Sequence, residues 1–507
     1  MSKLRITIKT EGRVIEVEAD PGKTTLEVIQ DAGLMFSAPC GGNGLCGKCM
    51  VYVHEAGGSG LRLACRIDAT DNMVIELDGP QTMLIEEEAA LSIYEPDVGR
   101  EGVGVALDIG TTTLACRLFD RSDGKLLASA ARVNPQAAWG ADVISRIDAS
   151  VAGKLEQMQD ALLYAIDQMV DELLSQTRYR RRHLVDFTVA GNTVMQHIAA
   201  GLPPDSIGLH PFIPISLFGD YHELPGIPCP VWFAPCMASY VGGDITAGII
   251  ANNMHRADST QMLLDLGTNG EMSLGDKNRI LSCATAAGPV FEGANIRFGM
   301  PALPGAISAA WEQDGHLAFD TIAGVAPKGL CGTGIVDVAA FMLRMGIVES
   351  TGRLLEADEC PEFADWLGEV DGAPVFYLTP ERDIFITQRD IRNIQLGKSA
   401  VFSGIQVLLS TAGLGFDDIT RLDIAGGFGK RLNLESAAIV GIIPAVWLDR
   451  AYAVGNSSVE GASAALMSSA ARADMLGLRD IAEYIELSIS PEFNEFFVEN
   501  MMFPELD

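Results

Sequence analysis

The sequence predicts a small α+β domain at the N-terminus, followed by a larger α/β domain built of two related lobes. Three observations support this prediction. Four cysteines stand close together among glycines, after a predicted pair of strands and a helix. From Gly102 onward, short apolar strand patterns alternate with longer helical patterns. Within that part, the phrase at 107–112 recurs in similar form at 264–269.

The first predicted elements are two strands in which apolar and polar side chains alternate with a period of two. Thr24 and Glu27 then have the spacing of a capping box, which predicts a short helix ending near Ala32. A cysteine-rich loop and further strands follow. The predicted strands are 4–8, 14–18, 50–53 and 73–77. This order of elements is typical of a β-grasp fold.

Cys40, Cys46, Cys49 and Cys65 have the close spacing that an iron–sulfur cluster or a zinc site needs. The loop also contains four glycines, which let the backbone curl round a cluster and direct N–H groups at its sulfurs. A zinc ribbon normally has two Cys-x2-Cys pairs, and this loop has one. The pattern therefore favours a 2Fe–2S cluster over zinc, and with it the handling of single electrons.

Composition narrows the function classes. The chain has 507 residues, and its formal net charge of −31 argues against nucleic acid or an anionic membrane as a partner. No stretch has the length and apolar character of a membrane span, and no targeting segment is recognised. Ten cysteines without a secretory signal indicate a reducing compartment, so we expect a cytoplasmic protein. The expected domains are 1–79, an acidic linker at 80–102, and 103–507.

The repeated phrase predicts a pair of phosphate-binding loops. In each copy an Asp ends a strand, a Gly follows, and hydroxyl or amide side chains come next. A strand-end carboxylate can hold hydrated Mg²⁺, and the glycine lets backbone N–H groups approach phosphate. Two such loops facing each other would hold a triphosphate between two lobes. The candidate residues are Asp108, Gly110, Thr111, Thr112, Thr113, Asp265, Gly267, Thr268, Asn269 and Gly270.

Four further segments complete an ordered set. They are a strand and turn at 188–193, an expected helix at 234–244, a Gly-Gly-x-Gly turn at 426–429 and a helix of small residues at 455–465. In this order the set resembles the ATPase superfamily of actin, sugar kinases, acetate kinase and heat-shock chaperones, over roughly 103–470. The resemblance implies two phosphate loops, two connecting helices and an adenosine loop at Gly426, Gly427 and Gly429.

A β-grasp 2Fe–2S ferredoxin joined to such an ATPase resembles one family in particular, the ATP-dependent reductive activators of corrinoid proteins. The phrases that fit are 265–271, 284–294, 331–337 and 391–400. The resemblance implies that an electron passes through the 2Fe–2S cluster and converts inactive Co(II) to Co(I). It also implies that this step depends on ATP, which is bound together with Mg²⁺. It also implies a corrinoid protein of a methyltransferase system as partner and an upstream electron donor, and it leaves a homodimer open.

The residue that activates water for ATP hydrolysis is the least defined. Chaperone-like members place a Glu where this chain has Ala234, so Asp244 and Glu271 become the first candidates, ahead of Glu292. Three alternatives stay open: a small-molecule kinase with a regulatory ferredoxin, an activator of another low-potential enzyme such as a 2-hydroxyacyl dehydratase, and a nucleotide-gated scaffold. The way in which ATP acts, by gating electron flow or by changing cobalt ligation, also stays open.

Overall fold

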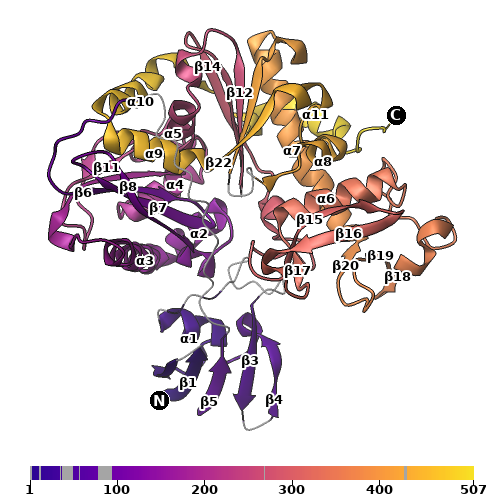
Figure 1. Cartoon of the computed structure of the whole chain (residues 1–507). Coiled ribbons are helices and arrows are strands. Elements are labelled where there is room, and N and C mark those ends of the chain that lie inside the picture. Colours follow the sequence, from indigo (N-terminus) through magenta and orange to yellow (C-terminus); the bar gives the residue numbers. More distant parts are fainter. Residues whose placement is uncertain are drawn as a thin grey trace.

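The computed structural model describes residues 3–10, 13–32, 34, 36, 49–55, 58–77, 94–267, 269–426 and 431–506. A small N-terminal domain lies below two lobes, each built round a six-stranded sheet (Figure 1). We define lobe one as residues 103–242, and lobe two as 261–455 together with 482–506. The predicted fold class is thus confirmed for both parts of the chain.

The N-terminal domain is a five-stranded sheet with one helix packed on it. The strand order is β2-β1-β5-β3-β4, with β1 and β5 parallel and the other neighbours antiparallel. Thr24 caps the helix through the predicted capping box with Glu27. The sequence pattern missed β4, whose glycines obscure its alternation. The elements are β1 (Leu4–Thr10), β2 (Arg13–Ala19), α1 (Thr25–Asp31), β3 (Met50–Glu55), β4 (Gly58–Leu63) and β5 (Met73–Glu76).

Lobe one has a sheet of order β10-β11-β9-β6-β7-β8. Its central strand β6 is buried along its whole length, as its unbroken apolar run predicts. Val105 and Leu107 face a core shared with α3 and α4, while Ala106 faces the other side. The elements are β6 (Val103–Ile109), β7 (Thr113–Asp120), β8 (Leu126–Val133), α2 (Val143–Ala149), α3 (Leu155–Ser175), β9 (Leu184–Gly191), α4 (Thr193–Ala199), β10 (Tyr221–His222) and β11 (Val231–Phe233).

Lobe two has a sheet of order β22-β21-β12-β13-β14-β23, and the long helix α7 packs on it. Two three-stranded sheets lie at its edge, in the orders β16-β15-β17 and β18-β19-β20. The elements are β12 (Gln261–Leu266), β13 (Gly270–Gly275), β14 (Ile280–Thr285), β15 (Ala306–Gln313), β16 (His316–Thr321), β17 (Gly329–Leu330), α6 (Gly332–Arg344), β18 (Leu367–Val370), β19 (Ala373–Tyr377), β20 (Phe385–Thr387), α7 (Gln388–Ala412), β21 (Arg421–Ala425), α8 (Leu434–Val440), β22 (Ala451–Gly455), β23 (Ala482–Tyr484) and α11 (Pro491–Glu499).

The two lobes repeat one topology, as the repeated phrase predicts. In lobe one, β8, β7 and β6 are antiparallel neighbours, and β9 and β11 continue the sheet in parallel. In lobe two, β14, β13 and β12 have the same antiparallel arrangement, followed by parallel β21 and β22. Asp108 and Asp265 are each the second-last residue of the first strand of its hairpin.

Three helices lie between the sheets: α5 (Gly243–Ala251), α9 (Ser457–Met467) and α10 (Ser469–Ile481). Helix α9 packs on β6 and β9 of lobe one, and α5 packs on β12 and β13 of lobe two. The two helices cross so closely that a Cβ on Gly461 would lie 2.0 Å from the carbonyl oxygen of Ala247. The helix predicted at 234–244 was wrong in its start, because α5 begins only at Gly243 and the residues before it form a bent segment.

The end of the expected linker is attached to the larger domain. Tyr94 Oη donates to Asp474 Oδ2 at 2.6 Å, and the Arg256 guanidinium lies over the Tyr94 ring. Asp97 accepts a hydrogen bond from the Ser469 amide at 2.7 Å. Residues 94–102 therefore follow the surface of α10 and lobe one, and only 80–93 of the expected linker lie outside the described residues.

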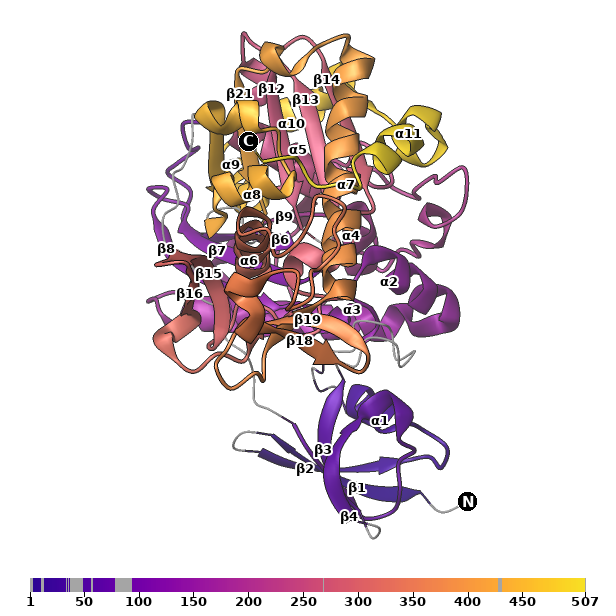
Figure 2. The same ribbon diagram turned by 90° about the vertical axis from the view of Figure 1, so that its right-hand side faces the viewer.

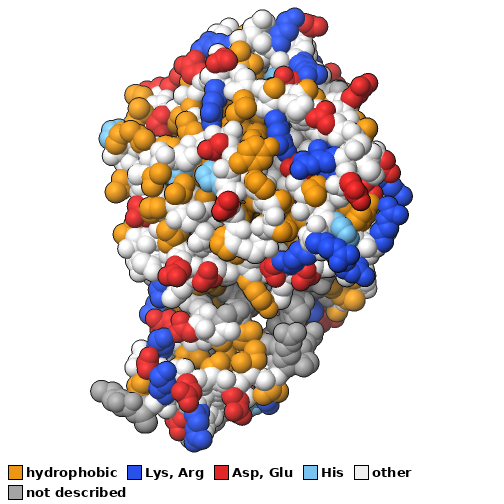
Figure 3. Space-filling view, turned by 90° about the vertical axis from the view of Figure 1, so that its left-hand side faces the viewer, with side chains coloured by type: hydrophobic (Ala, Val, Ile, Leu, Met, Phe, Trp, Pro, Cys, Tyr) orange, Lys and Arg blue, Asp and Glu red, His pale blue; other side chains and the backbone are white. Residues whose placement is uncertain are grey.

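The N-terminal domain sits with α1 at the end nearer the two lobes, as both ribbon views show (Figure 2). The Gln30 side chain on α1 donates to the carbonyl of Ala138 in lobe one. On the face of the molecule in Figure 3, acidic and basic side chains are interspersed rather than gathered by sign. None of the helices in the described ranges is long and apolar enough to cross a membrane.

Candidate functional site

Carboxyl groups from five different elements gather where β6 and β12 end. They are close enough for their charges to interact, and they belong to β6, α5, β12, β13 and the short helix η7 (Pro289–Glu292). The residues are Asp108, Asp244, Asp265, Glu271 and Glu292. We call them the carboxylate cluster. It includes both strand-end aspartates that the repeated phrase singles out.

Asp108 is held by the start of α9. Asn456 Nδ2 donates to Asp108 Oδ2 at 2.8 Å, and Ser458 Oγ donates to Asp108 Oδ1 at 2.8 Å. Burial raises the pKa of Asp108 to about 6, although both hydrogen bonds favour the charged form. Asn456 also caps α9 through its Oδ1, so the same side chain fixes the helix start and the carboxylate.

Asp265 has the least compensated charge of the cluster. Burial raises its pKa to about 8, and the charges of Asp244, Asp108 and Glu292 add to the effect. Burial likewise raises the pKa of Asp244, with a further contribution from Asp108. The pKa of Glu271 is raised by burial and then by its acidic neighbours. In each case burial is the largest cause, and for Asp244, Asp265 and Glu271 neighbouring carboxylates add to it.

Two hydrogen bonds cross between the lobes at this point. Thr112 Oγ1 in the loop after β6 donates to Glu292 Oε2 at 2.7 Å. Asn192, in the turn between β9 and α4, donates to Glu271 Oε1 at 3.4 Å. Asn269 donates to the same Glu271 oxygen at 3.0 Å. Lobe one thus presents a hydroxyl group and an amide group to carboxylates of lobe two.

Glycine is required at two positions beside the carboxylates. A Cβ at Gly110 would lie 2.5 Å from the carbonyl oxygen of Thr113, so the loop after β6 is too tight for a side chain. Gly426 has a φ of +106°, and a Cβ there would lie 2.4 Å from the Leu266 oxygen and 3.0 Å from Asp265 Oδ1. The backbone can therefore come close to a ligand at both loops.

The cluster has the chemistry of a site for a hydrated divalent cation and phosphate. Several neighbouring carboxylates in a buried cleft need a cation if they are to be ionised together. Mg²⁺ prefers oxygen ligands and retains several of its waters. In the described part of the chain, no three Asp, Glu, His or Cys side chains are close enough to hold one metal ion. The arrangement therefore fits a Mg²⁺ ion that is bound largely through water and phosphate.

Two of the four candidate cluster cysteines lie within the described residues. Cys49 Sγ and Cys65 Sγ are 3.2 Å apart, and both cysteines are buried. Two thiolates on one tetrahedral metal at about 2.3 Å from each sulfur lie about 3.7 Å apart. Cys49 and Cys65 are thus placed to share one metal after a shift of a few tenths of an ångström. Cys40 and Cys46 lie outside the described residues.

The structure brings most of the predicted ATP-site residues to one place. Thr268, Gly427 and Gly429 lie outside the described residues. The sequence did not predict the roles of Asn192, Asn456 and Ser458, which donate hydrogen bonds to members of the carboxylate cluster. The signal available for them was weak, because an Asn or Ser at a helix start is first a capping residue. It also placed Glu292 behind Asp244 and Glu271, yet Glu292 is the carboxylate that contacts the loop after β6.

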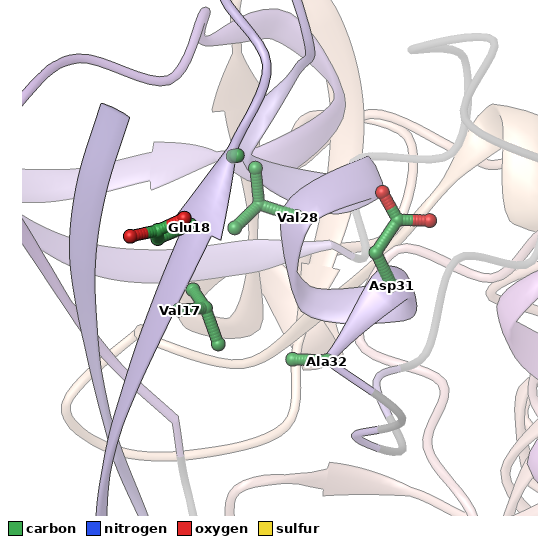
Figure 4. A pocket seen from close by; sticks show the side chains of 6 residues that line it. Val17, Glu18, Val28, Asp31 and Ala32 are labelled. Carbon is green, nitrogen blue, oxygen red and sulfur yellow. The ribbon is translucent and has the colours of Figure 1, made fainter. Parts of the chain in front are cut away.

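A shallow pocket lies away from this site, between β2 and α1 of the N-terminal domain (Figure 4). Its walls include Val17, Val28 and Ala32, with Glu18 and Asp31 at its edge. None of these residues is a cysteine or a member of the carboxylate cluster. The pocket therefore adds nothing to either centre.

Three family models match consecutive parts of the chain. Residues 8–70 match the 2Fe-2S iron-sulfur cluster binding domain. Residues 103–257 match the RACo middle region, and residues 259–507 match the C-terminal domain of RACo, the ASKHA domain. Together they extend over nearly the whole chain, and they divide it near the expected domain boundary.

The chain is also similar over its length to named proteins. Corrinoid activation enzyme RamQ of Eubacterium limosum is 28% identical, with 97% of this chain and 98% of the relative covered. The Co(II) methylated amine-specific corrinoid protein reductase of Methanosarcina barkeri is 21% identical over 78% of this chain and 76% of its own length. The solved structure of a reductive activator for corrinoid, iron-sulfur protein has a TM-score of 0.74 and 28% identity, and covers 99% of both chains.

Proposed function

The chain belongs to the RACo family of reductive activators, and we propose that it uses ATP to reduce the cobalt of a corrinoid protein from Co(II) to Co(I). One observation carries the proposal. A cysteine pair spaced for one metal and a cluster of buried carboxyl groups from two repeated lobes occur in the same chain. Relatives that match 97% and 78% of the chain are named for corrinoid activation and for corrinoid protein reduction. The Co(I) product would return the corrinoid protein to methyl transfer.

In this proposal Cys40, Cys46, Cys49 and Cys65 hold a 2Fe–2S cluster, which supplies a one-electron carrier when it is bound. An upstream donor delivers one electron, and the same electron reduces one Co(II). Cys49 and Cys65 bind the same iron because their sulfurs lie 3.2 Å apart. Their burial in the apolar core of the N-terminal domain limits the access of water to that side of the cluster.

ATP binds between the two loops of the repeat, with its phosphates on the backbone N–H groups beside Gly110 and Gly267. Asp108 and Asp265 hold the hydrated Mg²⁺ that relieves the negative charge of the carboxylate cluster. The hydroxyl groups of Thr111, Thr112 and Thr113, with Thr268 and Asn269, donate to phosphate oxygens. Gly426, Gly427 and Gly429 lie against the adenosine.

Asp244 and Glu271 are the residues we propose for orienting and activating the attacking water. Both lie in the carboxylate cluster, and burial raises the pKa of each toward the range in which a carboxylate can accept a proton. Glu271 is held by Asn192 from lobe one and Asn269 from lobe two, so its position depends on how the lobes close. Hydrolysis is thereby linked to lobe closure.

The proposal is tested with the reduced protein, a Co(II) corrinoid protein and a low-potential reductant under anaerobic conditions. Co(I) should appear in the visible spectrum only when Mg-ATP is present. Asp108→Asn should slow Co(I) formation more than tenfold and leave the cluster spectrum unchanged. The exposed Asp258→Asn is the matched control and should behave as wild type. Co(I) formation at the same rate without ATP would contradict the proposal.

A further inference from the structure

The loop after β6, residues 110–112, is held from behind by a second layer of buried polar groups. The Asn134 side chain donates through Nδ2 to the Gly110 carbonyl at 2.8 Å, and the Asn134 backbone N–H donates to the Thr112 carbonyl at 2.8 Å. Arg146 donates to the carbonyl between them, that of Thr111. Three successive carbonyls of the loop are thus held by side-chain and backbone groups of lobe one.

Arg146 is the centre of this layer. Its side chain is fully buried, and its other hydrogen bonds go to the Gly140 carbonyl at 3.1 Å, to Gln136 Oε1 at 3.3 Å and to Met195 Sδ at 2.9 Å. Its partners are therefore neutral groups. Burial lowers the pKa of Arg146 to about 9, so the guanidinium keeps its charge at neutral pH. A buried cation under the loop complements the phosphate that the loop is proposed to bind.

The same layer reaches the surface at the N-terminal domain. Asn134 caps the short helix η2 (Pro135–Ala138), and Gln136 within that helix bonds Arg146. The last residue of η2, Ala138, accepts the hydrogen bond from Gln30 of α1. Helix α1 also packs beside the short helix η1 (Ala64–Arg66) that carries Cys65, and the Thr25 amide donates to the Ile67 carbonyl at 2.8 Å.

We propose that η2 couples docking of the iron–sulfur domain to nucleotide binding, with Arg146 as the positioning residue between them. Docking through Gln30 fixes η2, and fixed η2 holds Asn134 and Arg146 in place under residues 110–112. ATP therefore binds more tightly when the domain is docked. By thermodynamic reciprocity, ATP raises the docked fraction by the same factor. This inference rests on the proposed ATP site. It adds that ATP binding there controls whether the iron–sulfur domain is docked on lobe one.

The test is a double-mutant cycle on the full chain with its cluster, in which calorimetry gives the Kd of Mg-AMP-PNP. Gln30→Ala removes one hydrogen bond at the surface and should raise this Kd by about three- to tenfold. Arg146→Lys keeps the charge but loses the planar guanidinium, whose N–H groups bond several partners at once. It should raise the Kd by about tenfold. The double variant should bind no more weakly than Arg146→Lys alone, because the Arg146 substitution already interrupts the contacts between η2 and residues 110–112. Gln313→Ala, at an exposed position in β15, is the control and should match wild type.

Hydrogen exchange supplies a readout that does not depend on the Arg146 variant. In Gln30→Ala the amides of residues 111–113 should exchange faster than in wild type, while the thermal midpoint stays the same. An unchanged Kd and unchanged exchange in Gln30→Ala would overturn the coupling. Equal effects of Gln30→Ala in the wild-type and Arg146→Lys backgrounds would overturn the role of Arg146. Failure of wild type to bind Mg-AMP-PNP would instead contradict the proposed function, and this inference with it.

Discussion

At the scale of single residues, the site depends on charges that the folded chain leaves uncompensated. Asp265 has four acidic neighbours, whereas Asp108 is stabilised by hydrogen bonds from Asn456 and Ser458. Two strand-end aspartates with the same local sequence are therefore in different environments. Asp265 is the carboxylate that gains most from a bound cation, and Asp108 is the one whose geometry is fixed beforehand.

The raised pKa values predict that the ligand-free protein loses stability as pH rises. The pKa of Asp265 is about 8 in the folded protein against 3.8 for an exposed Asp, so between these values the folded chain binds more protons than the unfolded chain. For this group stability is therefore greatest below pH 3.8 and falls as the pH rises from there to about 8. Asp265→Asn should stabilise the protein at pH 8 by about 1–2 kcal/mol and change little at pH 5. Thermal unfolding at both pH values measures this.

The control for that measurement is Asp258→Asn. Asp258 is exposed and paired with Lys277, which lowers its pKa below the tested range. It should leave the difference between pH 5 and pH 8 unchanged. If Asp265→Asn also leaves that difference unchanged, Asp265 is ionised at neutral pH, and the conclusion that burial and its acidic neighbours raise its pKa is wrong.

The cysteines give a second prediction at this scale. Cys65→Ser should abolish the visible absorption and the reduced-state electron paramagnetic resonance signal of the cluster, because one iron loses one of its two proposed protein ligands. Cys229→Ser is the matched control, since Cys229 is a free and partly exposed thiol in lobe one. Retention of a full-strength cluster in Cys65→Ser would show that the ligand set is different.

At the scale of elements, the site depends on where the helices between the lobes begin. Helix α9 brings Asn456 and Ser458 to a carboxylate 348 and 350 positions earlier in the chain. Helix α5 brings Asp244 to the cluster in its first turn. The close crossing of α5 and α9 at Gly461 keeps both helix starts in place.

Ser458→Ala isolates the contribution of α9 to the site. The variant loses one hydrogen bond to Asp108, so the ionised form of Asp108 is less favoured and the affinity for Mg-ATP should fall by about three- to tenfold. Ser463→Ala lies on the same helix, where its hydroxyl bonds only the Val459 carbonyl, and is the matched control. Calorimetric titration compares the two. Equal affinities would mean that Asp108 does not take part in binding.

The helix crossing gives a prediction about stability. Gly461→Ala places a methyl group against the backbone of Ala247 and should destabilise the protein by about 1–3 kcal/mol. Gly477→Ala in α10 meets no atom within 4 Å and should stabilise it by up to about 1 kcal/mol. Urea unfolding distinguishes the signs. A neutral Gly461→Ala would show that the helices can separate without cost.

Elements with a local signal could be predicted from the sequence, and long-range arrangements could not. The capping box at Thr24 and the strand near whose end Asp108 stands follow local rules, and the structure has both near the predicted positions. The helix predicted at 234–244 was wrong in its start because its small residues satisfy helix and loop alike. The bonds from Asn456 and Ser458 to Asp108 depend on tertiary packing, which no local pattern records.

At the scale of the whole molecule, the N-terminal domain and the cleft are connected through lobe one. The N-terminal domain contacts lobe one at Ala138, and from there buried groups lead to the loop after β6. The linker end at Tyr94 is fixed on α10, far along the chain from that contact. Movement of the N-terminal domain relative to the lobes therefore breaks the contact between Gln30 and Ala138.

The central claim is that ATP in the cleft controls a one-electron transfer from the cluster to cobalt. Its most direct test is a single-turnover, stopped-flow reaction of pre-reduced protein with a Co(II) corrinoid protein, without excess reductant. The visible spectrum reports cluster oxidation and Co(I) formation together. We expect about one Co(I) for each 2Fe–2S cluster oxidised when Mg-ATP is present, and none when it is absent. Co(I) formed equally without ATP, or formed by Cys65→Ser with ATP, would contradict it.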